Sequence, residues 1–212
     1  MQLLQTVARY IGRRFQLILV LVANQAMILG IMAFGDYMIG AWRPKQIPHY
    51  IWALFDSPLH IIVAILVTAP LCIKPSSPRN TVFRFVLVGL LSAMIDLDHF
   101  VAAKSLSLYD AINLLYRPAT HSLLFALICA FTAWWITRNP RHCVIIFLAL
   151  ASHLLRDGAS GVTPFLLWPV AFKRFSTQAS YAAQVGLACL SWTCAYLFYI
   201  VRRKERSGHI EY

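Results

Sequence analysis

The amino-acid sequence predicts an all-α, multi-pass membrane protein with about six transmembrane helices, and three observations support this fold class. The mean hydropathy is +0.65, and 59% of the 212 residues are hydrophobic. Only 13% are charged, whereas a soluble domain needs roughly a quarter to cover its surface. The apolar residues also form long blocks, several of which reach the roughly 20 residues that span a bilayer.

Helix-breaking residues separate the predicted spans. Pro75 and Pro78 lie between the second span and the third, and Pro140 follows the fourth. Gly158 and Gly161 are expected to end the fifth helix. The six spans are predicted at about 15–34, 51–73, 81–103, 119–137, 143–157 and 180–201.

Two further segments complete the predicted chain. The apolar stretch 162–172 is about half as long as a span and contains Pro164 and Pro169, so we expect an interfacial or re-entrant segment. A basic tail, 202–212, follows the last span. We find no internal repeat and no second domain, so residues 1–212 are predicted to form a single integral membrane domain.

The basic residues predict how the chain is oriented. The net charge is +11, but the Lys and Arg residues lie singly or in small groups between apolar blocks. This distribution is typical of membrane topology rather than of a nucleic-acid partner. With the N-terminus inside, the inner segments hold the majority of the 19 Lys and Arg residues. We therefore expect both termini in the cytoplasm, with the lipid bilayer as the principal partner.

Charged groups inside spans are costly and usually functional, and most of the eight acids lie there. Five acids and four of the seven histidines fall inside apolar segments or at their ends. They are Asp36, Asp56, Asp96, Asp98, Asp157, His60, His99, His121 and His153. Under the six-span topology, five helices bring these residues to the same outer face of the membrane. The sequence therefore predicts one shared polar site.

Their spacing favours metal ligation. Asp56 and His60 are four residues apart, as are His153 and Asp157, so each pair lies on one helical face, about 40° apart. Asp96 and His99 are three apart and also share a face. Asp98 points away from Asp96 if the helix is regular, so it either orients a ligand or lies where the helix ends.

Carboxylates and imidazoles without thiolates suit zinc, manganese or iron. With more than four candidate ligands, the site could hold more than one metal ion.

Two arginines accompany the cluster. Arg117 lies four residues before His121, and Arg156 lies between His153 and Asp157. A guanidinium beside a metal centre suits an anionic substrate group such as phosphate. Alternatively, these arginines balance the acids or anchor helix ends at the interface.

Three motifs resemble those of known families. They are SAMIDLDHF at 92–100, RPATHS at 117–122 and SHLLRDG at 152–158. In these residues the chain resembles the animal transmembrane protein 267 family. It is more distantly similar to a bacterial inner-membrane family whose members are inferred to be metal-dependent hydrolases. That bacterial pattern has an early helical His, then P-D-x-D-H, H-R-x-x-T-H-S and H-x-x-x-D.

The resemblance implies a ligand set and also shows two departures. It maps the early His onto His60, the second element onto Asp96, Asp98 and His99, the third onto Arg117, Thr120, His121 and Ser122, and the fourth onto His153 and Asp157. Ile95 replaces the proline of the second element. Tyr116 stands where the third element has its first histidine, which puts the number of metals and catalysis in question.

These observations predict a membrane-embedded metal-dependent hydrolase acting on a lipid phosphate or phosphoester at the outer or lumenal leaflet. The metal, expected to be zinc, would be held by His60, Asp96, His99, His121, His153 and Asp157. Asp56 or Asp98 would orient ligands or act as general base, and Arg117 and Arg156 would hold the anion. The alternatives are a transporter that relays protons or metal ions through the Asp/His chain, and an inactive membrane scaffold.

Overall fold

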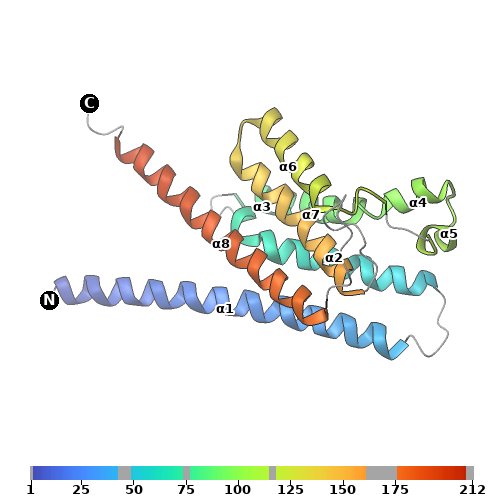
Figure 1. Ribbon diagram of the computed structural model, residues 1–212. Helices are drawn as coiled ribbons and strands as arrows, with labels where there is room; N and C mark the ends of the chain where they lie inside the picture. The colour runs from blue at the N-terminus through green and yellow to red at the C-terminus, as the bar shows by residue number, and fades with distance from the viewer. Residues whose placement is uncertain (1, 43–48, 74–76, 115–117, 161–175, 209–212) are drawn as a thin grey trace.

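The computed structural model describes residues 2–42, 49–73, 77–114, 118–160 and 176–208. Every regular element in these ranges is a helix (Figure 1). The helices are α1 (Gln2–Trp42), α2 (His49–Cys72), α3 (Pro78–Met94), α4 (Leu97–Ala103), α5 (Leu108–Ile112), α6 (Leu123–Thr137), α7 (Pro140–Ser160) and α8 (Thr177–Gly208). The predicted all-α class is confirmed.

Four segments are long and apolar enough to cross a membrane, which confirms a multi-pass protein. They are Phe15–Gly40, Phe55–Cys72, Pro78–Ala103 and Thr177–Arg202, and they correspond to the first, second, third and sixth predicted spans. The fourth corresponds to the shorter apolar helix α6, with 15 residues, and the fifth to α7, with 21. That all six segments cross the bilayer stays a prediction.

Helix α7 lies at the centre of the bundle and packs against α2, α3, α6 and α8. Its middle is buried on every side, because Leu148, Ala149, Ala151 and Leu154 are all at most 1% exposed. The two alanines are small enough for neighbouring helices to approach closely, as is common in membrane bundles. Outward-facing side chains such as Phe131 and Val82 are apolar and exposed, as expected for a surface in contact with lipid.

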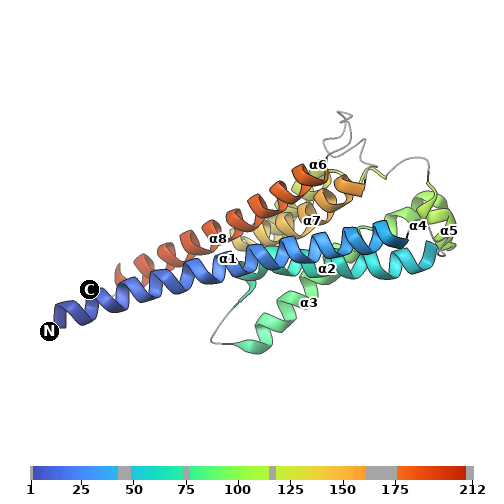
Figure 2. The ribbon, with the colours of Figure 1, turned by 90° about the horizontal axis from the view of Figure 1, so that it is seen from below.

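Both chain ends point to the same side of the molecule. The N-terminal end of α1 and the C-terminal end of α8 lie on one side, while α4 and α5 lie at the opposite end (Figures 1 and 2). This agrees with an even number of crossings. Which side faces the cytoplasm stays a prediction based on the charge bias.

Three predicted boundaries differ from the ends of the helices. Helix α1 continues past Phe34 to Trp42, since Asp36 is stabilised by tertiary partners rather than by water. Helix α6 begins at Leu123 and not at 119, because the Ser122 hydroxyl caps the helix by accepting a hydrogen bond from the Phe125 amide at 3.2 Å. Helix α7 continues through Gly158 to Ser160. The stretch 162–172 lies outside the described residues.

Candidate metal centre

Four side chains at one end of the bundle converge on a single point. Asp96, His121, His153 and Asp157 each offer one ligand atom, and these atoms lie within 4.8 Å of one another. His121, His153 and Asp157 are at most 5% exposed, while the Asp96 side chain is 36% exposed. The cluster is therefore buried but remains accessible on the side of Asp96.

The distances within this group match the ligand shell of a small cation. Nε2 of His121 lies 3.6 Å from Oδ1 of Asp96 and 3.4 Å from Oδ2 of Asp157. Nε2 of His153 lies 3.3 Å and 3.6 Å from the same two oxygens. Zinc–ligand bonds of about 2.0–2.2 Å in a tetrahedron place the ligand atoms roughly 3.3–3.6 Å apart. Four of the six distances among these atoms are thus compatible with ligands of one small cation.

The local chain conformation explains how the four residues meet. His153 and Asp157 are one helical turn apart on α7 and therefore share a face. Asp96 lies in a turn where α3 ends and α4 begins, with its amide bonded to the Ala93 carbonyl. His121 lies in the turn before α6, where its amide donates to the Pro118 carbonyl at 2.9 Å.

Asp98 orients one of these histidines. Its Oδ2 lies 3.0 Å from Nδ1 of His121, and its Oδ1 lies 2.9 Å from Nδ1 of His99. A carboxylate on the far nitrogen of a ligating histidine is the usual second contact around protein-bound metals. The turn at Ile95–Asp96 breaks the regular helix, and this is why Asp98 does not point away from the cluster as a regular helix would require.

A second group of donors adjoins the first. Nε2 of His60 lies 3.4 Å from Oδ2 of Asp56 and 3.4 Å from Oδ1 of Asp157. The His60 ring also stacks on His153, with ring centroids 4.0 Å apart. Asp157 therefore directs one oxygen toward each group, so its carboxylate is placed to bridge two positions.

Arg156 ties this end of the bundle together. Its guanidinium is buried, with Nη2 at 2.9 Å from Oδ1 of Asp56 and Nη1 at 3.6 Å from Oδ1 of Asp36. The Tyr181 hydroxyl donates to Oδ2 of Asp36 at 2.7 Å. The network links α1, α2, α7 and α8. The sequence predicted Asp36 to lie at the shared polar site, but no sequence spacing could have paired it with Tyr181.

The structure brings most of the predicted acids and imidazoles together, but two of the predicted site residues lie differently. Arg156 was predicted to hold an anion, but it is engaged by two carboxylates, which favours the alternative that it balances the acids. His99 contacts Asp98 and packs edge-to-face on His121 with ring centroids 4.5 Å apart, outside the four-atom group. Arg117 and Tyr116 lie outside the described residues.

Buried ring nitrogens in this group could hold a cation. Among the described residues, Nε2 of His121 and both ring nitrogens of His153 have no hydrogen-bond partner, although they are buried. Each such group costs roughly 1–3 kcal/mol when left unsatisfied, and a cation between the two Nε2 atoms would satisfy both. Burial lowers the pKa of His121, but the carboxylates of Asp96, Asp98 and Asp157 outweigh it, so that its pKa lies above the ordinary value.

The fold and the cluster together define a class of protein: a multi-pass helical membrane protein with a buried histidine–aspartate centre whose residues could hold a metal ion. Comparison with known sequences then gives the family. The model of the YdjM inner membrane protein family matches residues 55–211, and the chain belongs to this family. The match includes every member of the cluster except Asp36.

Animal relatives are similar over most of the chain. Transmembrane protein 267 of Danio rerio is 29% identical over 168 residues, covering 75% of this chain and 73% of that protein. Transmembrane protein 267 of Bos taurus is 26% identical over 191 residues, covering 84% and 86%. The family resemblance seen in the sequence motifs is thus confirmed. No solved structure matches the chain.

Proposed function

We propose that this protein is a membrane-embedded, metal-dependent hydrolase whose zinc ion is held by Asp96, His121, His153 and Asp157. The observation that supports this most strongly is the set of four nitrogen–oxygen distances of 3.3–3.6 Å among buried side chains. Two imidazoles and two carboxylates are a ligand set that suits zinc. Their combined charge also balances a divalent cation when both histidines are neutral.

A second cation position is supported by the adjoining group. Asp56, His60 and Asp157 offer three ligand atoms within 4.8 Å of one another. Because Asp157 directs its two oxygens to the two groups, we propose that it bridges two ions. Paired metal sites are common in enzymes that hydrolyse phosphoesters.

The remaining roles, water activation and ligand orientation, fall to different groups. A divalent cation in this site would lower the pKa of bound water to about 7 and polarise a phosphoryl oxygen. Oδ2 of Asp56 faces the second cation position and Oδ1 contacts Arg156, so we assign Asp56 to hold that position rather than to act as general base. Asp98 holds two histidines, so we assign it the task of orienting His121.

We propose a phosphoester, such as a lipid phosphate, as the substrate. The carboxylates and histidines of the two groups gather at one end of the bundle, which corresponds to one leaflet. With both termini in the cytoplasm, as the charge bias predicts, this leaflet is the outer or lumenal one. Arg117, close in sequence to His121, is the proposed ligand of the anionic group.

The arrangement is less suited to a transporter. A proton or metal relay needs titratable groups through the depth of the membrane. In the described interior, several polar side chains away from the cluster bond instead to backbone carbonyls. Thr68 donates to Ala64 at 2.8 Å, Asn24 to Leu66 at 3.2 Å, and Gln184 to Ser152.

Metal analysis of the purified protein tests the proposal. We expect bound zinc in the wild type and its loss in His121→Ala and Asp157→Ala. His142→Ala, near the other end of α7, is the matched control and should keep its metal. A metal-free wild type would exclude the hydrolase. If metal is bound, phosphate release from a panel of phospholipids and lipid phosphates separates an enzyme from an inactive scaffold.

A further inference from the structure

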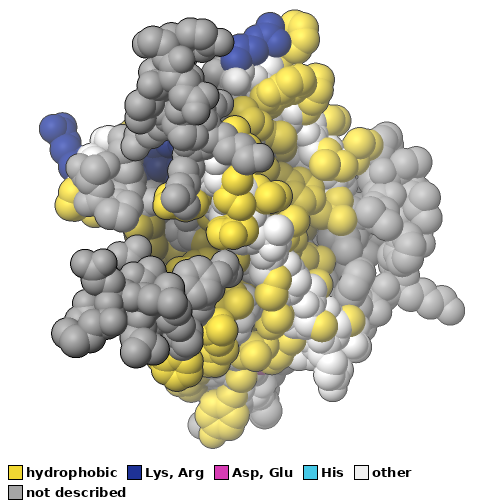
Figure 3. Space-filling model, turned by 90° about the vertical axis from the view of Figure 1, so that its left-hand side faces the viewer, with side chains coloured by type: hydrophobic (Ala, Val, Ile, Leu, Met, Phe, Trp, Pro, Cys, Tyr) yellow, Lys and Arg dark blue, Asp and Glu magenta, His cyan; other side chains and the backbone are white. Residues whose placement is uncertain are grey.

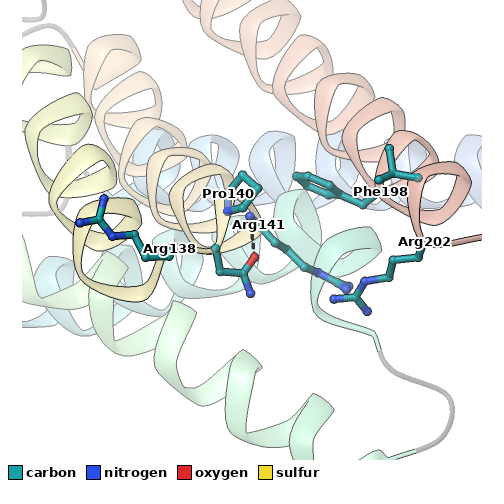
Figure 4. Close-up of a pocket in the computed structure, with 7 residues that line it drawn as sticks. Arg138, Pro140, Arg141, Phe198 and Arg202 are labelled. Carbon is teal, nitrogen blue, oxygen red and sulfur yellow. Dashed lines mark hydrogen bonds between the residues drawn. The ribbon is translucent and has the colours of Figure 1, made fainter. Parts of the chain in front are cut away.

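A second candidate site lies at the other end of the bundle. A cavity of about 340 Å³ opens between the α6–α7 turn and the end of α8 (Figure 4). It is lined by Arg138, Asn139, Pro140, Arg141, Phe198, Val201 and Arg202. Arg141 precedes His153 by 12 residues on α7, which places the cavity roughly 18 Å from the metal centre along the helix.

Two guanidinium groups face each other in this cavity. Figure 4 shows the side chains of Arg141 and Arg202 directed toward one another from α7 and α8. Burial and the positive charges of nearby Arg84 and Arg202 lower the pKa of Arg141. Like charges held close together at a partly buried position are unfavourable unless an anion lies between them.

Helix capping explains the positions of Arg141 and Arg84 but not that of Arg202. Nε and Nη2 of Arg141 donate to the Leu71 carbonyl, and Nη1 of Arg84 donates to the Cys72 carbonyl at 3.4 Å. Both therefore cap the C-terminal end of α2, where cations are favourable. Arg202 makes no hydrogen bond or ion pair with any residue that the structure describes.

No carboxylate among the described side chains balances this charge. All six acids with described side chains lie at the opposite end, in or near the metal centre or on α5: Asp36, Asp56, Asp96, Asp98, Asp110 and Asp157. On the face shown in Figure 3, the visible described charges are Lys or Arg alone. None of these six acids supplies a counter-charge at this end of the bundle.

We propose that the cavity binds a phosphate-bearing anion, either the headgroup of an acidic phospholipid or free phosphate. Arginine binds phosphate through paired N–H donors, which Arg202 and the free side of Arg141 supply. Phe198 and Val201 form an apolar wall along which an acyl chain would lie. If the termini are cytoplasmic, the cavity faces the leaflet that carries anionic lipids. This site does not depend on the metal centre.

Ligand-induced stabilisation of the detergent-purified full chain tests this proposal. The three probes are dioctanoyl phosphatidic acid, dioctanoyl phosphatidylcholine and inorganic phosphate, each titrated while Tm is recorded. We expect phosphatidic acid to raise Tm more than phosphatidylcholine does. Arg202→Gln should raise the apparent Kd for phosphatidic acid roughly tenfold. Arg79→Gln, which removes an exposed charge near the start of α3, should leave the Kd unchanged.

Further variants distinguish a lipid headgroup from free phosphate, and a wrong proposal from an unstable variant. If the ligand is a lipid, Phe198→Ala should weaken the binding of phosphatidic acid but not the binding of inorganic phosphate. If the ligand is a free anion, inorganic phosphate should raise Tm as much as phosphatidic acid does. Arg202→Lys keeps the charge but loses the paired geometry, so an intermediate Kd supports the site even if Arg202→Gln is unstable. Equal effects of Arg79→Gln and Arg202→Gln, or no preference for phosphatidic acid over phosphatidylcholine, would overturn the proposal.

Discussion

Oδ2 of Asp98 lies 3.0 Å from Nδ1 of His121, and this contact determines which ring nitrogen points toward the candidate metal centre. With Nδ1 held by the carboxylate, Nε2 is directed toward Asp96 and Asp157. The carboxylate also fixes the tautomer, because a proton on Nδ1 leaves the Nε2 lone pair free for a cation.

Asp98→Asn is therefore expected to weaken metal binding without abolishing it. Loss of such an orienting carboxylate typically lowers metal affinity about 10–100-fold. Competition against a zinc chelator measures the change. Asp110→Asn, in α5 and outside the cluster, is the control. Equal affinities for wild type and Asp98→Asn would show that the contact has no orienting role.

Metal stoichiometry separates the two proposed cation positions. We expect two ions per chain in the wild type, one in His60→Ala and none in Asp157→Ala, because Asp157 contributes an oxygen to both groups. Elemental analysis against protein concentration provides the count. His99→Ala should keep both ions, since its ring contacts Asp98; loss of metal in that variant would restore His99 as a ligand.

Arg156→Gln is expected to destabilise the bundle. Removing one partner of a fully buried ion pair costs roughly 3–5 kcal/mol. The Asp36 and Asp56 side chains are 34% and 38% exposed, so solvent screening should reduce the cost to about 2 kcal/mol. Thermal unfolding in detergent measures the loss. Arg79→Gln is the control for a removed surface charge, and an unchanged Tm in Arg156→Gln would contradict the structural role of the network.

Tyr181→Phe tests the outer contact of the same network. The variant loses one hydrogen bond to Asp36 and keeps the ring, so we expect a loss of about 1 kcal/mol. The effect should be smaller than that of Arg156→Gln. If Tyr181→Phe has its full effect even in an Arg156→Gln background, the two contacts act independently.

Metal affinity is expected to rise with pH across the neutral range. The pKa of His121 lies above its ordinary value, so protons compete with a cation for its ring up to a higher pH than at an ordinary histidine. Raising the pH removes this competition, and lowering it strengthens the competition. Chelator titrations at several pH values check the sign, and an affinity independent of pH would show that no imidazole loses a proton on binding.

Much of the fold followed from local signals. The hydropathy blocks placed the transmembrane helices because burial in lipid demands long apolar helices. The ends of the helices were less predictable. Ser122 caps α6 three positions inside the predicted start, and Asp36 lies within α1, where Arg156 and Tyr181 contact its carboxylate. Neither partner is near Asp36 in the sequence.

The candidate site was likewise predictable in part. Helical spacing alone paired His153 with Asp157 and Asp56 with His60, since residues four apart share a face. It also assigned Asp96 to the ligands and Asp98 to an orienting or basic role, but it could not say which histidine Asp98 contacts. That contact depends on the turn at Ile95–Asp96, which directs Asp96 to the four-atom group and Asp98 to the back of His121.

The sequence by itself determined that acids and imidazoles gather at one end of a membrane bundle, because hydropathy sets the depth of each residue and helical periodicity sets its face. Only the tertiary structure decided what each of them does. It placed four ligand atoms 3.3–3.6 Å apart, and it engaged Arg156 with two carboxylates instead of leaving it for a substrate. Depth and face are local properties of one helix, whereas the distance between two side chains depends on how separate helices pack.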